Sequence, residues 1–197
     1  SETFYQIVRK LAKNSKKSDK LSCNILGPAS LGFRHRDDVL EIEKILTAMG
    51  IEINLVAPSG ASPEDIQYKT AKAHFNVMLY PEIAETTCRY LEKEFNQPFT
   101  KTVPIGIGAT RQFIKEISDK EIPGFGELFR ELSYKTIGTS AIQSRACAVL
   151  SNGKYIFSLP GSSGGVTDAW DGILKYQLDI NHKPCNFVEL FPRLKEK

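Results

Sequence analysis

The sequence lacks any apolar run long enough to cross a membrane, and it has almost no excess of charge of either sign. Its longer apolar stretches, such as Ile53 to Ala57, are far shorter than the roughly 20 residues that a spanning helix needs. Lysine and arginine number 26 against 23 acidic residues, so the net charge of +3 gives no general field for holding a polyanion. We therefore expect no membrane span and no nucleic-acid partner.

Cysteine is also scarce, and its spacing excludes the common metal sites. The four cysteines are far apart, with no CxxC pair and no histidine nearby: Cys23, Cys88, Cys147 and Cys185. Cys88 falls in an apolar helical stripe and Cys147 in a strand-like run, which predicts small buried residues with reduced thiols and a cytoplasmic protein. We expect no metal site, although an iron–sulfur ligand completed by partner subunits stays open.

A starting methionine is missing too, and no charged-then-apolar leader follows Ser1, so we expect a piece of a longer chain. The 197 residues, 41% hydrophobic and 25% charged, are enough for one large domain or two small ones. Residues 1–22 predict a short amphipathic helix followed by the polar run Lys13 to Lys20. We interpret that run as an exposed linker, with phosphate binding by its lysines as the alternative.

Residues 23–118 alternate between short apolar strands and amphipathic helices. Strands are predicted at 23–27, 51–56 and 74–79, and Ser62-Pro63 has the pattern of a helix N-cap followed by proline. Strands separated by helices favour a parallel sheet covered on both faces. The predicted fold class is therefore α/β, beginning with a three-layer Rossmann-like parallel sheet.

Residues 119–197 predict a smaller α/β unit. Asn152-Gly153 stands between the apolar runs Ala146 to Leu150 and Tyr155 to Leu159, which is a strong hairpin signal. We expect both parts of the chain to supply parallel strands, so that one part could complete the sheet of the other.

The strongest local signal for chemistry is the glycine-serine loop Pro160 to Gly165, which joins a strand to a helix. Small residues let a ligand approach the backbone, and the N–H groups at a helix start attract anions. Ser144 and Arg145, just before the hairpin, add a hydroxyl and a fork-shaped cation. The candidate oxyanion site thus comprises Ser144, Arg145, Pro160, Gly161, Ser162 and Gly164. A tight turn without a ligand, or a site around His35, is the alternative.

The N-terminal part resembles a known family in four segments. They are Ser1 to Phe4, Leu31 to Val39, Ala57 to Pro63 and Pro104 to Arg111. In these segments, residues 1–118 are similar to the middle part of the B subunit of light-independent (dark-operative) protochlorophyllide reductase, a nitrogenase component 1-like family. That resemblance implies an oxidoreductase of chlorophyll biosynthesis with a [4Fe–4S] cluster and, as its partner, the N subunit. The aspartates with which the family holds its cluster and protonates its substrate are assigned to no residue here.

The C-terminal part resembles a second family. The similarity is found in four segments: Gly124 to Arg130, Gln143 to Ala146, Leu159 to Ser162 and Pro184 to Leu190. Here residues 119–197 are similar to the C-terminal half of the molybdopterin adenylyltransferases of molybdenum cofactor biosynthesis. The resemblance implies a pterin held by Pro160, Gly161 and Ser162, with Mg²⁺ and ATP as further ligands and a trimeric assembly. That family's Gly-Gly-Thr-Gly phosphate loop and acidic Mg²⁺ residues have no counterpart in residues 1–118.

The two resemblances meet near Ser118 to Lys120, so the chain looks like a splice of two gene pieces. Three functional hypotheses follow: an inactive fragment of the reductase joined to a partial molybdopterin-binding domain, a molybdopterin-binding or adenylylating protein, and a catalytically inert α/β module.

Overall fold

The computed structural model describes residues 2–30 and 33–194. The chain forms two compact units, unit 1 (Ser1–Ile117) and unit 2 (Ser118–Lys197). Three residues of the resemblance segments, Ser1, Leu31 and Gly32, lie outside the described residues.

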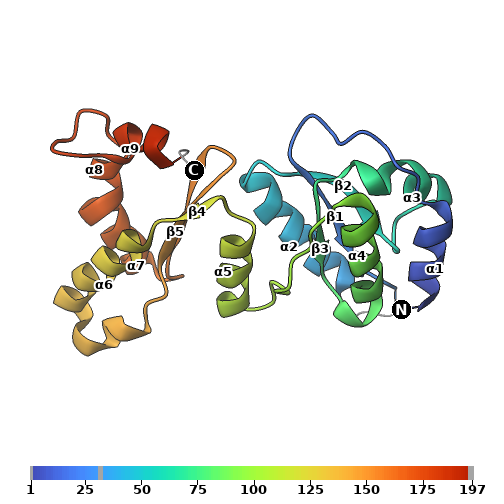
Figure 1. The fold of residues 1–197 in the computed structure, drawn as a ribbon. Coiled ribbons are helices and arrows are strands. Elements are labelled where there is room, and N and C mark those ends of the chain that lie inside the picture. The colour runs from blue at the N-terminus through green and yellow to red at the C-terminus, as the bar shows by residue number, and fades with distance from the viewer. Residues whose placement is uncertain (1, 31–32, 195–197) are drawn as a thin grey trace. The chain divides into compact units, whose positions relative to one another are not determined.

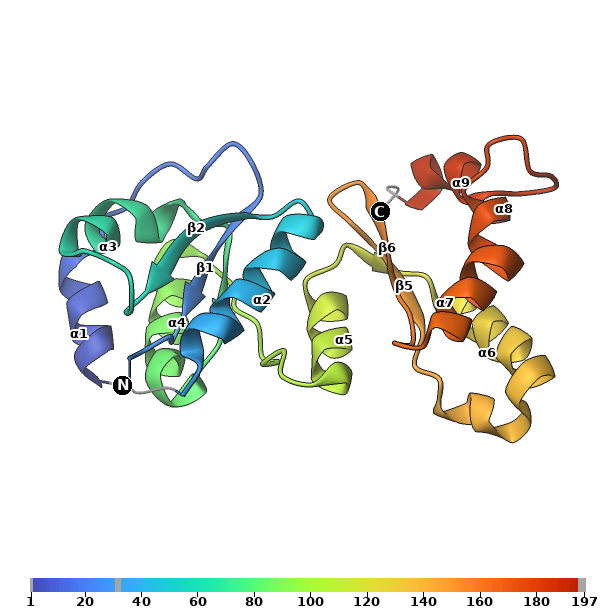
Figure 2. The same cartoon turned by 180° about the vertical axis from the view of Figure 1, so that it is seen from behind.

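Unit 1 is built on a parallel three-stranded sheet with the strand order β2-β1-β3. Its elements are α1 (Glu2–Leu11), β1 (Ser22–Leu26), α2 (His35–Ala48), β2 (Glu52–Ala57), α3 (Pro63–Lys69), the 3-10 helix η1 (Thr70–Lys72), β3 (Phe75–Met78), α4 (Pro81–Phe95) and α5 (Ile107–Glu116). The opposite views of Figures 1 and 2 show this sheet between α2 on one side and α4 on the other. The expected three-layer α/β arrangement with a parallel sheet is therefore confirmed.

The core on one face of this sheet also includes the first helix. Phe4 and Val8 of α1 are buried with Met78 of β3 and Leu91 of α4. Their spacing of four residues places both side chains on one face of α1. Burial of these apolar side chains stabilises α1 against the sheet layer.

The lysine run after α1 is only partly exposed, which corrects the expectation of a purely solvated linker. Lys17 Nζ donates hydrogen bonds to the carbonyl oxygens of Ala73 at 2.7 Å and Phe95 at 3.2 Å. Burial lowers the pKa of Lys17 from its usual value. The composition of the run is typical of a solvated loop, but two carbonyl groups from distant segments offer this lysine fixed acceptors.

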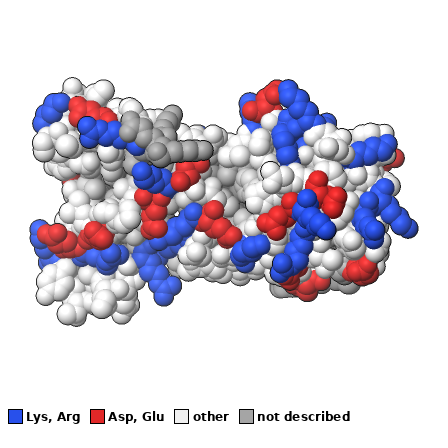
Figure 3. All heavy atoms as spheres, viewed as in Figure 1, with Lys and Arg blue, Asp and Glu red and all other residues white. Residues whose placement is uncertain are grey.

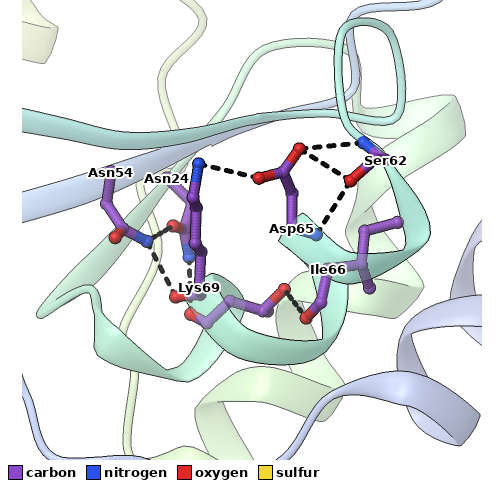
Figure 4. A network of polar contacts seen from close by, with 7 residues as sticks. Asn24, Asn54, Ser62, Asp65, Ile66 and Lys69 are labelled. Atoms are coloured by element: carbon purple, nitrogen blue, oxygen red, sulfur yellow. Dashed lines mark hydrogen bonds and ion pairs between the residues drawn. The ribbon is translucent and has the colours of Figure 1, made fainter.

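Three amide side chains form an asparagine ladder (Asn54, Asn24 and Asn76) across the sheet. Asn54 Nδ2 donates to Asn24 Oδ1 at 2.6 Å, and Asn24 Nδ2 donates to Asn76 Oδ1 at 2.8 Å. The ladder also binds the chain near the end of α3, through the carbonyl oxygens of Lys69 and Thr70 (Figure 4). Asn24 and Asn76 are completely buried, so these bonds replace the water that both amides lose on folding.

The start of α3 is fixed by a capping box. Ser62 Oγ accepts a hydrogen bond from the Asp65 N–H at 3.1 Å, and Asp65 Oδ2 accepts one from the Ser62 N–H at 3.0 Å (Figure 4). Asp65 also pairs with Lys69 Nζ at 2.7 Å. The hydrogen bond from Lys69 and then those from Ser62 lower the pKa of Asp65 to about 2. Residues within one turn of α3 thus stabilise the charged carboxylate.

We expect the cap of α3 to survive mild acid and to fail only near pH 2. The folded pKa of Asp65 is lowered, so its contribution to stability is present above the unfolded value of about 4 and is lost as the pH falls through about 2. Hydrogen-exchange protection factors of the Ser62 amide, measured from pH 5 to pH 2, should stay constant to about pH 4 and then fall. In Asp65→Asn, protection at pH 5 should be lower than in the parent and independent of pH, because the neutral amide oxygen is a weaker acceptor than the carboxylate and does not titrate. Equal profiles for the two proteins would contradict this assignment.

Unit 2 has its own three-stranded sheet, in the order β4-β5-β6, and it is antiparallel. Its elements are β4 (Lys120–Glu121), α6 (Pro123–Ile137), the 3-10 helix η2 (Gly138–Gln143), β5 (Cys147–Ser151), β6 (Lys154–Ser158), α7 (Ser163–Ala169), the π-helix η3 (Trp170–Leu174), α8 (Lys175–Gln177) and α9 (Phe187–Leu194). The predicted hairpin is confirmed. The expectation of parallel strands in this part is wrong, because a two-residue turn joins β5 and β6, and such a connection can only pair strands antiparallel.

The turn of the hairpin follows from its two residues. Asn152 and Gly153 have φ angles of 46° and 76°, the left-handed values that a two-residue hairpin turn requires at both positions. Glycine has no Cβ to oppose this conformation, and asparagine adopts it more readily than most residues. Asp119 Oδ2 accepts a hydrogen bond from the Asn152 N–H at 2.8 Å, which ties the turn to the chain entering β4.

The core of unit 2 lies between its sheet and α6, with η3 packed alongside. Phe125 and Phe129 of α6 are buried with Ala148 of β5 and Ile173 of η3. Tyr155 of β6 donates a hydrogen bond from its hydroxyl to the Phe187 carbonyl at 2.7 Å, which secures the start of α9. Among the helices of the described residues, none is long and apolar enough to span a membrane.

Candidate functional site

The hairpin brings the two predicted parts of the oxyanion site to one end of unit 2. Its ladder ends at the pair Cys147 and Ser158. Ser144 and Arg145 lie just before Cys147, and the loop Pro160 to Gly165 begins two residues after Ser158. Because the strands are antiparallel, both segments leave the sheet at the same end of the hairpin. We call this end the open end of the hairpin.

The glycine-serine loop ends in a capped helix start. Ser162 Oγ accepts a hydrogen bond from the Gly165 N–H at 3.2 Å, so Ser162 is the N-cap of α7. Ser163 and Gly164 follow this N-cap in the first turn of α7. Their N–H groups have no acceptor within the helix. Gly161, Ser162 and Gly164 are exposed, and a Cβ at Gly161 or Gly164 would meet no atom within 4 Å. A ligand can therefore approach these backbone groups from solvent.

The other segment is shaped by a local turn. Ser144 N–H donates to the Ala141 carbonyl at 3.0 Å, and Ser144 Oγ is a long 3.5 Å from the Ala146 nitrogen. Ser144 is half-buried and Arg145 is exposed. The hydroxyl and the guanidinium thus stand beside the start of β5, where each retains hydrogen-bonding capacity for an anion.

Sequence reasoning missed a second arginine close to this edge. Gly126, one turn before Arg130 on α6, is buried, and a Cβ there would lie 2.6 Å from the Ala146 carbonyl oxygen. Arg130 Nη1 is 3.5 Å from the same point. The spacing of four residues between Gly126 and Arg130 was the available signal, because it places both on one face of a helix.

The described residues do not fit the iron–sulfur cluster or the Mg²⁺ ion that the two resemblances imply. Burial raises the pKa of the Cys23 thiol and that of the Cys88 thiol to about 12, so both are poor sources of the thiolate that a cluster needs. Cys147 is also buried and only Cys185 is exposed. Over residues 2–30 and 33–194, no group of three or more histidine, cysteine or acidic side chains is placed to hold a metal ion.

Two of the histidines lie in unit 1, at the starts of β3 and α2. His74 Nδ1 accepts a hydrogen bond from the Ser22 N–H at 3.1 Å, a contact that joins the starts of β3 and β1. This agrees with a structural role. His35 begins α2, at the carboxyl end of the sheet of unit 1.

The fold is that of a two-part α/β protein. A three-layer unit with a parallel sheet is followed by a hairpin unit that carries the glycine-serine loop. Residues 1–121 match the family model of the nitrogenase component 1 type oxidoreductases, and residues 107–179 match that of a probable molybdopterin binding domain. Since the first match covers more than half of the chain, the protein belongs to the nitrogenase component 1 type oxidoreductase family. The matches overlap over residues 107–121, so α5 and the expected junction at Ser118 to Lys120 lie in both.

Similar proteins are found for both parts. The B subunit of light-independent protochlorophyllide reductase from Dinoroseobacter shibae is 61% identical over 116 residues, which cover 59% of this chain and 22% of that protein. Its counterpart from Cereibacter sphaeroides is 60% identical over 117 residues, with coverages of 59% and 22%. A crystal structure of molybdenum cofactor biosynthesis protein B superposes with a TM-score of 0.38 at 22% identity, over 91% of this chain and 98% of that one. The chain spans about a fifth of the length of these reductase relatives.

Proposed function

We propose that unit 2 binds a phosphorylated pterin, or a simpler oxyanion, at the open end of the hairpin. The observation that carries this proposal is that Ser144 and Arg145 lie at the open end of the hairpin together with the loop Pro160 to Gly165. The match of residues 107–179 to a molybdopterin binding domain supports the choice of a pterin. The site residues are Ser144, Arg145, Pro160, Gly161, Ser162 and Gly164.

The chemistry of the edge favours anions. Backbone N–H groups at a helix start carry partial positive charge, and the Arg145 guanidinium offers two parallel N–H donors to a phosphate or carboxylate. On the face shown in Figure 3, acidic and basic side chains are interspersed rather than gathered by sign. This pattern favours a local anion site over a surface for a long polyanion.

For unit 1 we propose the role of a reductase fragment without activity of its own. The match to one component of a multi-subunit reductase supports contact with a partner, and we propose that reductase's N subunit, or self-association through unit 2, as the candidates. The buried thiols of Cys23, Cys88 and Cys147, which form no disulfide among the described residues, support a cytoplasmic location. The polypeptide should neither reduce protochlorophyllide nor transfer an adenylyl group, since no described cluster of side chains holds the metal groups of either reaction.

Replacing Gly161 with valine should weaken phosphate binding about tenfold without unfolding unit 2, a loss comparable with one charge-assisted hydrogen bond. A Cβ at Gly161 meets no atom within 4 Å, so valine fits the fold but covers the approach to the loop. Phosphate and a phosphorylated pterin are titrated while the amide signals of Gly161, Ser162 and Gly164 are followed by NMR.

The matched control is Thr167→Val, which places the same side chain at an exposed position later in α7. It should bind as the parent does. Shifts confined to Arg34 to Arg36 in unit 1, or equal affinities for the Gly161 and Thr167 variants, would refute the proposed site.

A further inference from the structure

The positive charge of the chain is concentrated in one segment of unit 1. Residues 9–20 contain six of the 26 basic residues and one of the 23 acidic residues, Asp19, which leaves 20 basic and 22 acidic residues in the rest of the chain. The segment comprises the end of α1 and the lysine run that follows it. The net charge of +3 therefore originates here, while the remaining residues are slightly acidic.

The lysine run is held against α3 and η1 by its own backbone. The Lys13 N–H donates to the Gln67 carbonyl oxygen at 3.1 Å, and the Ser18 N–H donates to the Lys72 carbonyl oxygen at 3.0 Å. Lys17 turns inward and donates to two carbonyl groups. Figures 1 and 2 both show α1 beside α3, where the run begins. These contacts hold the exposed lysines of the run in defined places on the surface.

Three exposed lysines lie around the ring of Tyr68, and we call these four residues the lysine surface: Lys10, Lys13, Lys72 and Tyr68. Lys13 Nζ lies 5.5 Å from the centroid of the Tyr68 ring, and Lys72 follows Tyr68 by four residues along α3 and η1. None of the three ammonium groups forms an ion pair within residues 2–30 and 33–194. Their like charges repel one another, and carboxylates from a partner would remove that repulsion.

The neighbouring lysines indicate which kind of anion this part of unit 1 accepts. Three of them pair with carboxylates: Lys16 with Asp19 at 3.5 Å, Lys20 with Glu52 at 2.9 Å and Lys69 with Asp65 at 2.7 Å. A lysine ammonium is a point charge that suits a single carboxylate oxygen, whereas the fork of an arginine favours phosphates. The acidic residues between the lysines would also repel the closely spaced phosphates of a nucleic acid.

A lipid bilayer is a poor partner for the same surface. A helix that binds a bilayer in its plane inserts an apolar face between the lipids. In α1 the apolar residues Phe4 and Val8 are buried in the core of unit 1. This face of the helix is therefore not available to lipid.

We propose that the lysine surface is a docking site for an acidic segment of a partner polypeptide, whose carboxylates pair with Lys10, Lys13 and Lys72. The Tyr68 side chain, which is 54% exposed, gives the segment an aromatic contact among these charges. Ion pairs between exposed groups contribute little each, so binding depends on several pairs at once and weakens with salt. The surface belongs to unit 1 and needs no ligand at the open end of the hairpin.

The test is the binding of a labelled peptide of alternating glutamate and serine to the full chain, measured by fluorescence anisotropy at low salt. The variant that removes the three charges combines Lys10→Gln, Lys13→Gln and Lys72→Gln. It should bind the peptide about tenfold more weakly than the parent. A peptide with glutamine in place of glutamate should not bind.

The matched control removes three exposed lysines elsewhere and combines Lys44→Gln, Lys93→Gln and Lys135→Gln. Its affinity should stay within about twofold of that of the parent, and thermal melting checks the fold of both variants. If the two triple variants bind equally, the peptide responds to the overall charge and the lysine surface is overturned.

A second readout needs no variant. The ring signals of Tyr68 in the parent chain should shift in NMR spectra when the glutamate peptide is added, and unchanged signals at saturation would contradict the proposed contact. Vesicles of phosphatidylserine and a single-stranded DNA are titrated in parallel. If either binds more tightly than the peptide and depends on the same three lysines, the choice of a polypeptide partner is wrong.

Discussion

Replacing Gly126 with alanine is expected to destabilise unit 2 by about 2 kcal/mol, within the range for overpacking a close contact. The added Cβ would lie 2.6 Å from the Ala146 carbonyl oxygen, a distance that real Cβ atoms do not reach. Since the neighbour is backbone, α6 or the start of β5 must move, and the gain in helix propensity from glycine to alanine is smaller than this cost. Denaturant unfolding followed through the aromatic residues of unit 2 measures the loss.

Gly124 provides a control on the same helix. A Cβ at Gly124 meets no atom within 4 Å, so Gly124→Ala should leave stability unchanged or raise it by less than about 1 kcal/mol. Opposite signs for the two substitutions would identify the close approach of α6 to β5 as the cause. Equal effects would mean that this contact is looser than the structure has it.

Replacing Asn24 with alanine is expected to destabilise unit 1 by about 3 kcal/mol. Asn24 is the middle member of the asparagine ladder, and its loss removes the bond to Asn76 Oδ1, the bond from Asn54 Nδ2 and a donor to the Thr70 carbonyl. Each buried polar group that loses its partner costs about 1–3 kcal/mol, although Gln97 Nε2 still donates to Thr70 at 2.9 Å. Urea unfolding with a probe in unit 1 measures the change.

Asn54→Ala is the matched comparison, because Asn54 stands at the more exposed end of the same ladder. Water can replace its bonds, so we expect a loss of about 1 kcal/mol or less. If Asn24→Ala lowers the free energy of unfolding no more than Asn54→Ala does, the buried position of Asn24 adds little to the stability of unit 1.

The parts of the fold that could be predicted from sequence are those set by local rules. Ser62 followed by proline and then Asp65 predicted where α3 starts, and the Asn152-Gly153 pair predicted the hairpin, because both depend on a few adjacent residues. The third strand of the antiparallel sheet of unit 2 was not predicted. This strand, β4, has only two residues, Lys120 and Glu121, too few to show any alternation.

The candidate site was predictable in part for the same reason. The composition of the loop Pro160 to Gly165 predicts an anion site, and the hairpin register brings this loop to the same end of the hairpin as Ser144 and Arg145. Arg130 was overlooked because its position depends on a contact between α6 and the chain entering β5, which are separated by many residues. The buried asparagine ladder was missed for a similar reason, since each asparagine taken alone is typical of a turn or an exposed loop.

The separate sheets have a consequence for how such a chain can arise. Each strand finds its hydrogen-bonding partners within its own group of three: β1 with β2 and β3, and β5 with β4 and β6. A genetic exchange near residue 118 therefore separates no strand from its partner. Recombination at most other points of a sheet protein leaves unpaired edges that invite aggregation. A crossover at this point would instead keep together every strand pair that the described residues of the two sheets form.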